Sequence, residues 1–151
     1  MVPHNSDSTH QQQFEKELIG QCACRLSAAL ISKELTLKSG TKVQIDGFNE
    51  KNRILCEAFA RIGNMKPGQK RKLGSDILKL IFVERTLGGQ WRKIICVSAD
   101  SHAEKYLKGH SWIGQIVREF DFIVDVSFLS AEWKERILDA EKRQSHSIKT
   151  S

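Results

Sequence analysis

KVQIDGFNEKNRILCEAFA, residues 42–60, contains the clearest secondary-structure pattern in the chain. Residues 42–46 alternate polar and apolar side chains, which is typical of a strand with one buried face. Residues 53–60 are mostly Ile, Leu, Cys and Phe, which favours a second strand inside the core. The connecting segment 47–52, with its glycine and two asparagines, is typical of a hairpin turn. We therefore expect a β-hairpin over residues 42–60.

Helices are expected on both sides of this hairpin in the sequence. Upstream, apolar residues at helical spacing predict an amphipathic helix from residue 14 to about residue 31. Downstream, a helix is expected to begin near Gln69 and to end before Gly88 and Gly89. The remaining expected elements are a strand over 93–98, a helical stretch over 101–119 with a break at Gly109, a strand over 122–129 and a last helix after Ser130. Strand, helix and strand in succession predict an α/β fold with a mixed sheet and helices on both faces.

The length and composition indicate a single domain. A chain of 151 residues with 40% hydrophobic residues can bury one core. Residues 1–13 are mostly polar and are expected to form a disordered arm, residues 14–144 the domain, and residues 145–151 a flexible tail. No stretch approaches the roughly 20 consecutive apolar residues of a membrane span. Residues 1–13 also lack the apolar region of a signal peptide, so we expect a cytoplasmic protein with no membrane contact.

The net charge bears on the kind of partner, and the cysteine spacing bears on zinc sites and disulfides. The net charge of +6 favours polyanions as partners, although many proteins carry such a charge for solubility alone. The four cysteines, Cys22, Cys24, Cys56 and Cys96, have spacings that match neither a zinc pair nor a disulfide scaffold. Three of them lie in apolar runs. Buried free thiols are therefore expected, and a structural zinc site is not.

Two acidic residues of the hairpin are the first candidates for a functional site. Asp46 ends the first strand and Glu57 lies within the second, so the short turn brings both carboxylates to one end of the sheet. Such a pair can bind Mg²⁺, which prefers carboxylate oxygens and acidifies a bound water. Asp46 also precedes Gly47, and in that position an aspartate is a common turn residue. Glu57 interrupts an apolar strand, which requires either an ion pair or a functional role.

The order of elements, with an Asp at the end of one strand and a Glu inside the next, resembles the core of the PD-(D/E)XK nuclease superfamily. This superfamily includes restriction, repair and recombination endonucleases, and the resemblance spans residues 14–144. It implies a three-layer, restriction-endonuclease-like α/β core and a DNA endonuclease that depends on Mg²⁺ or Mn²⁺. Asp46 and Glu57 would bind the metal, with Glu15 of the first helix in support. Because Glu15 falls on the buried face of that helix, it needs a partner, which is either the metal or Arg25.

The catalytic lysine of this superfamily usually stands two residues after the Glu, where this chain has Phe59. Some members supply the lysine from the following helix, whose first residues here are rich in basic side chains. At 100° per residue, Gln69 and Lys70 flank the apolar face of that helix. We therefore expect Lys70 to act in catalysis with Gln69, and backbone amides at the helix start to assist phosphate binding. The expected nucleic-acid contacts are Lys66, Lys70, Arg71 and Lys72.

The sequence is also compatible with two other functions. Asp76 and Lys79, on the same helix, have the pattern of surface residues and are given no role. A second possible function is a catalytically inactive module of the nuclease fold that binds nucleic acid or a protein. A third is a small α/β domain in which Asp100, after the 93–98 strand, lines a ligand crevice. As a nuclease the domain would depend on a homodimer, a partner protein or a DNA structure for target recognition.

Overall fold

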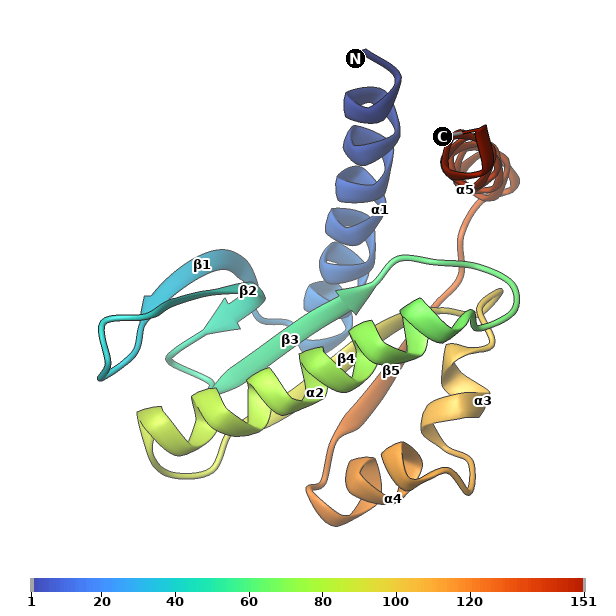
Figure 1. The fold of residues 1–151 in the computed structure, drawn as a ribbon. Helices are drawn as coiled ribbons and strands as arrows, with labels where there is room; N and C mark the ends of the chain where they lie inside the picture. The colour runs from blue at the N-terminus through green and yellow to red at the C-terminus, as the bar shows by residue number, and fades with distance from the viewer. Residues whose placement is uncertain (1, 151) are drawn as a thin grey trace.

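The computed structural model describes the backbone of residues 2–150 and the side chains of residues 9–139, 142 and 143 (Figure 1). It contains five helices and five strands. The helices are α1 (Val2–Leu26), α2 (Pro67–Leu87), α3 (Ala103–Leu107), α4 (Trp112–Glu119) and α5 (Ala131–Thr150). The strands are β1 (Ile31–Thr36), β2 (Lys42–Asn49), β3 (Ile54–Phe59), β4 (Arg92–Ser98) and β5 (Ile123–Ser127).

The strands form one five-stranded sheet in the order β1-β2-β3-β4-β5. The first three strands pair antiparallel, and β3, β4 and β5 pair parallel. Parallel neighbours need a crossover connection, which α2 provides between β3 and β4, and α3 with α4 between β4 and β5. The predicted α/β fold with a mixed sheet and helices on both faces is therefore confirmed.

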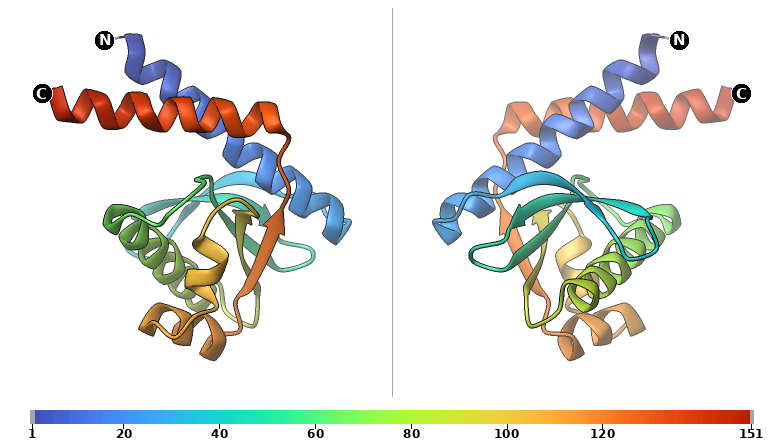
Figure 2. Two further views of the ribbon diagram at one scale, coloured as in Figure 1. Left: turned by 90° about the vertical axis from the view of Figure 1, so that its right-hand side faces the viewer. Right: turned by 90° about the vertical axis from the view of Figure 1, so that its left-hand side faces the viewer.

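The alternation of side chains along β3 divides the core into two parts. Ile54, Cys56 and Ala58 point to the face covered by α1 and α5. Leu55 and Phe59 point to the other face, which is covered by α2, α3 and α4. Figure 2 shows α1 and α5 crossing on one side of the sheet, with α2 and α4 on the other. Because both faces are covered, every residue of β3 is buried.

The ends of the chain differ from the sequence prediction. Residues 2–13, expected as a disordered arm, form the first part of α1, which ends at Leu26 and not near residue 31. Gln11 ties this part to the domain, since its amide donates to the Ala60 carbonyl and its side-chain oxygen accepts from Arg61. Residues 145–150 of the expected flexible tail belong to α5, and Ser151 lies outside the described residues.

Three of these helices have 20 or more residues, namely α1, α2 and α5. Length alone would allow each of them to approach a bilayer span. Over residues 2–150, however, no helix combines that length with the apolar composition that crossing a membrane requires.

The edge of the sheet also differs from the prediction. β1 was not predicted, because nearly all of its residues are exposed and such a strand has no buried face to produce a periodic pattern. It pairs with β2, which continues past Asp46 to Asn49. Asp46 therefore lies within a strand, and its alternative interpretation as a turn residue is wrong. The turn of the hairpin comes later, at residues 50–53, where Arg53 has a positive φ of 53°.

Two leucines of α2 provide a test of this packing. Leu80 is 0% exposed and Leu78 is 67% exposed. Leu80→Ala removes apolar contacts with the sheet and should lower the free energy of unfolding by about 2–5 kcal/mol. The same change at Leu78 should stay within about 0.5 kcal/mol of the wild type. Urea denaturation measures both, and equal losses would contradict the assigned orientation of α2.

Candidate active site

A fork in the sheet brings Asp46 and Glu57 together. β2 and β3 pair only from Gly47↔Cys56 to Asn49↔Ile54, and before Gly47 the two strands separate. The backbone N–H of Asp46 donates to Oε2 of Glu57 at 2.8 Å. In return, the backbone N–H of Ala58 donates to Oδ2 of Asp46 at 2.9 Å. Each carboxylate therefore accepts a hydrogen bond from a backbone N–H of the other strand, in place of the backbone carbonyl that regular strand pairing would supply.

The lysine beside this pair comes from α2. The ammonium group of Lys79 forms an ion pair with Oε1 of Glu57 and donates to the Gln44 carbonyl at 2.8 Å. One turn earlier, Asp76 forms an ion pair with Lys72, with 3.0 Å between Nζ and Oδ2. Lys72, Asp76 and Lys79 are spaced i, i+4 and i+7 and so share one helix face. The expectation that Asp76 and Lys79 are surface residues is therefore wrong, since Asp76 is 7% exposed and Lys79 faces the fork.

Burial and mutual repulsion perturb the acidic groups of this site. Burial raises the pKa of Glu57 to about 7, and the charge of Asp46 adds to this effect against the opposing influence of Lys79. Burial also raises the pKa of Glu15, again with a contribution from Asp46. The pKa of Asp76 is raised by burial although Lys72 opposes it. Since Asp46 acts on all three groups, the four carboxyl groups form one electrostatic cluster, which we call the acidic cluster.

Lys72 is the more exposed of the two lysines at the site. Burial lowers its pKa, but the charge of Asp76, with those of Glu15 and Asp46, outweighs that effect and raises the pKa. The side chain of Lys72 is 45% exposed, compared with 26% for Lys79. Lys72 therefore stays protonated and presents a positive charge at the edge of the acidic cluster.

A cavity of about 560 Å³ connects the acidic cluster to the surface. It lies between α1 and the β1–β2 pair, and both Glu15 and Asp46 line it. Its other lining residues combine polar groups with an apolar wall: Gln12, Lys16, Ser32 and Gln44, and Ile19, Gly20, Leu30 and Ile31. A ligand can therefore reach the Glu15 and Asp46 carboxylates without displacing the core.

Of the basic residues that the sequence favoured, Lys72 reaches the acidic cluster and the others lie elsewhere. The ammonium group of Lys70 lies 5.3 Å from the centre of the Tyr106 ring. The side-chain oxygen of Gln69 accepts from the backbone N–H of Lys66 at 3.1 Å, which caps the start of α2. Lys66 and Arg71 are exposed on the same first turns. The position predicted for Lys70 beside Glu57 is therefore taken by Lys79.

Other sequence candidates lie away from the acidic cluster. Arg25, the alternative partner for Glu15, pairs instead with Asp125. Phe59, in the position of the superfamily lysine, is 1% exposed within the core. Asp100, the residue of the predicted crevice, forms an ion pair with Lys134 of α5 at 3.2 Å.

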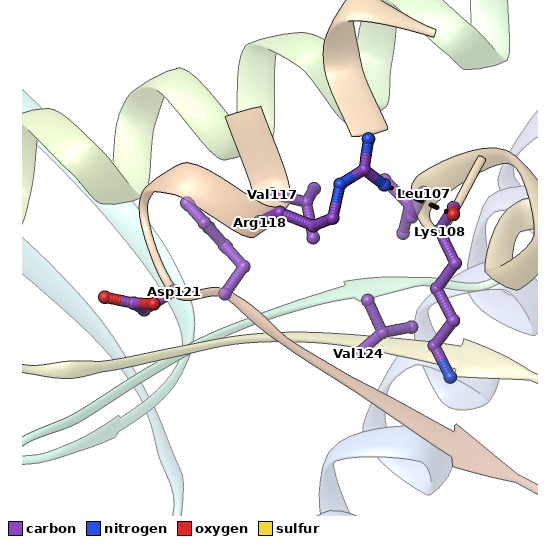
Figure 3. A pocket seen from close by; sticks show the side chains of 7 residues that line it. Leu107, Lys108, Val117, Arg118, Asp121 and Val124 are labelled. Atoms are coloured by element: carbon purple, nitrogen blue, oxygen red, sulfur yellow. Dashed lines mark hydrogen bonds between the residues drawn. The ribbon is translucent and has the colours of Figure 1, made fainter. Parts of the chain in front are cut away.

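A second cavity, of about 400 Å³, lies beside α3, α4 and β5. Arg118 lines it and donates to the carbonyls of Lys108 and Gly109 at 3.3 and 2.9 Å, so its charge is already engaged (Figure 3). Asp121 lies at the far end from Lys108 in this view. Among the described residues that line this cavity, Asp121 provides the only carboxylate. A cavity of this kind lacks the paired acids found at the fork.

Comparisons of the chain with protein-family models, with curated proteins and with solved structures gave no match. The function must therefore be inferred from the acidic cluster and its lysines.

The titration of Glu57 gives a test of the site. Its pKa is about 7 in the folded protein, against an ordinary value of 4.5 that applies to the unfolded chain. The folded state therefore binds the proton more tightly, and Glu57 loses its stabilising contribution as the pH rises from about 4.5 to about 7. The free energy of unfolding of the wild type minus that of Glu57→Gln should fall across this window.

Glu15 and Asp76 titrate in the same direction, but both are present in the two proteins and cancel in the difference to first order. Carboxyl-carbon NMR should show a midpoint near 7 that is missing in Glu57→Gln. A midpoint near 4.5, with a flat stability difference, would show that Glu57 is neither buried nor close to Asp46.

Proposed function

We propose that the chain is a metal-dependent DNA endonuclease that hydrolyses phosphodiester bonds. One observation carries the proposal: Asp46 and Glu57 meet at the fork of the sheet, where α2 supplies Lys79 to Glu57 and, one to two turns earlier, the Lys72–Asp76 pair of the acidic cluster. Acidic groups held together at the cost of raised pKa values are typical of functional sites. The mixed sheet and the order of these groups support membership of the PD-(D/E)XK superfamily with a restriction-endonuclease-like core.

The acidic cluster suits a hard divalent cation, either Mg²⁺ or Mn²⁺. Asp46 and Glu57 would hold it, with Glu15 in support from α1, because carboxylate oxygens are the donors such ions prefer. Burial raises the pKa values of Glu57 and Glu15, and the Asp46 charge adds to this effect; a bound cation would oppose both by stabilising the charged carboxylates. When bound, the cation supplies an acidified water and stabilises negative charge on the phosphate.

The two lysines have different roles in this proposal. Lys79 is held between Glu57 and the Gln44 carbonyl, so it positions the Glu57 carboxylate. Lys72 remains protonated and partly exposed, so it can contact the scissile phosphate and stabilise the charge that develops there. Lys72 would thereby supply the positive charge that the superfamily usually takes from a lysine at the position of Phe59.

The DNA backbone would approach along the first turns of α2. Lys66, Lys70 and Arg71 are exposed there, close in sequence to Lys72, and their charges suit phosphate contacts. Basic contacts of this kind make binding weaken as salt rises. Recognition of the target would come from a second copy of the chain, a partner protein or the form of the DNA itself.

One observation favours a second candidate, a catalytically inactive nuclease-fold module. Both oxygens of Glu57 already have protein partners, the Asp46 N–H and the Lys79 ammonium group. A carboxylate with these two partners can have a purely structural role, in which it joins β2 and α2 to β3. A module of this kind would bind DNA or a protein without any requirement for a metal.

Cleavage of supercoiled plasmid and of branched DNA with Mg²⁺ or Mn²⁺ separates the two candidates. Glu57→Gln, Asp46→Asn and Lys72→Met should each lower the rate by about 10²- to 10⁴-fold, since each removes a group that acts at the reacting phosphate. Lys70→Met is the matched control, because it removes the same charge from the same helix at a position beside Tyr106. Because Lys70 is also expected to contact the DNA backbone, this control should weaken DNA binding, but at saturating DNA it should change the rate little.

Circular dichroism should first establish that each variant is folded. Metal-independent DNA binding that survives Glu57→Gln, with no cleavage by the wild type, would support the inactive module. Loss of cleavage in Lys70→Met but not in Lys72→Met would contradict the role assigned to Lys72.

A further inference from the structure

Three buried cysteines from separate elements meet on the face of the sheet that α1 covers. They are Cys22 of α1, Cys56 of β3 and Cys96 of β4, and each is 0% exposed. Their Sγ atoms all lie within 4.8 Å of one another. Cys56 precedes Glu57 in the sequence, but alternation along β3 directs it toward α1, on the opposite face of the strand from Glu57. The cysteine cluster therefore shares no residue with the acidic cluster, although α1 contributes Cys22 to one and Glu15 to the other.

A carboxylate lies next to these thiols. Asp125 of β5 pairs with Cys96 in the parallel register, so the two side chains lie on the same face of the sheet. Arg25 holds this carboxylate, with 3.1 Å between Nε and Oδ1. Three sulfurs thus converge from three elements of the fold, with the Asp125 carboxylate of a fourth element beside them.

We propose that Cys22, Cys56 and Cys96 bind a thiophilic divalent cation, Zn²⁺ in the first instance, with a water molecule as the fourth donor and the Asp125 carboxylate as a neighbouring negative charge. A tetrahedral zinc site with Zn–S distances of about 2.3 Å places its sulfurs about 3.8 Å apart. The observed limit of 4.8 Å is close enough that side-chain rotation can close the site. The soft sulfur donors select against Mg²⁺, so the two sites would take different ions.

The charges around the cysteine cluster fit this cation. Three thiolates and Asp125 carry four negative charges, of which a divalent ion and Arg25 neutralise three. The Asp125 side chain is 15% exposed and that of Arg25 is 42% exposed, so an ion can enter past this pair.

Binding at this site would join α1 to the centre of the sheet. Cys22 lies on the same helix as Glu15, two turns further along, so the ion would fix the helix that supports the acidic cluster. The cation would then contribute directly to the free energy of folding, as structural zinc does in small domains.

Titration of the full, reduced, metal-free chain with Cd²⁺ tests the proposal directly. Cadmium bound to thiolates gives an ultraviolet charge-transfer band, which should saturate at about one equivalent for a single site with four donors. Zn²⁺ should remove the band by competition and should raise the melting temperature of the wild type. Cys22→Ser, Cys56→Ser and Cys96→Ser should each weaken Cd²⁺ binding by at least about tenfold.

Cys24→Ser is the matched control, because Cys24 is exposed on the same helix and should leave the titration unchanged. Glu57→Gln should also keep the band, which distinguishes this site from the acidic cluster. Asp125→Asn should weaken binding but keep the band, and it tests the site without altering a buried thiol. A wild type that shows neither a saturable band nor a Zn²⁺-dependent rise in melting temperature would overturn the proposal, as would a band that only Cys24→Ser abolishes.

Discussion

The separation of β2 from β3 leaves two backbone N–H groups, those of Asp46 and Ala58, without the strand partner that a regular ladder would give them. Unpaired N–H groups in a buried position are costly, so acceptors must come from elsewhere. The carboxylates of Glu57 and Asp46 supply them at 2.8 and 2.9 Å. A carboxylate buried to 2% exposure in turn requires a cation, which Lys79 of α2 provides. The position of α2 over the sheet and the fork of the sheet are therefore coupled.

This coupling leaves negative charge uncompensated. Lys79 and the Asp46 N–H both lower the pKa of Glu57, yet burial and the Asp46 charge still keep it near 7. Glu15 and Asp76 are shifted in the same direction. A site selected for stability alone would replace such groups with apolar ones, since buried ion pairs often stabilise less than hydrophobic packing does. A cation bound at the fork would account for their presence.

The sequence predicted the parts of the structure that depend on local pattern. The hairpin that carries Asp46 and Glu57 follows from strand periodicity and a turn rich in Gly and Asn, and the mixed sheet follows from the order of elements. It did not predict the role of Lys79. Helical periodicity shows where Lys79 lies around the axis of α2, but it does not show which part of the sheet that side of α2 covers. The cysteine cluster was missed for a similar reason: its members come from α1, β3 and β4 and have no informative spacing. β1 was missed because an exposed edge strand has little periodicity.

Crystals of the protein grown with DNA and Mn²⁺, with diffraction data collected at the manganese absorption edge, would show whether the fork binds a metal ion. We expect an anomalous peak at the fork, coordinated by Asp46 and Glu57, with a phosphate of the DNA beside Lys72. A fork without manganese, in which Glu57 still pairs only with Lys79 and the Asp46 N–H while DNA lies elsewhere, would contradict this expectation.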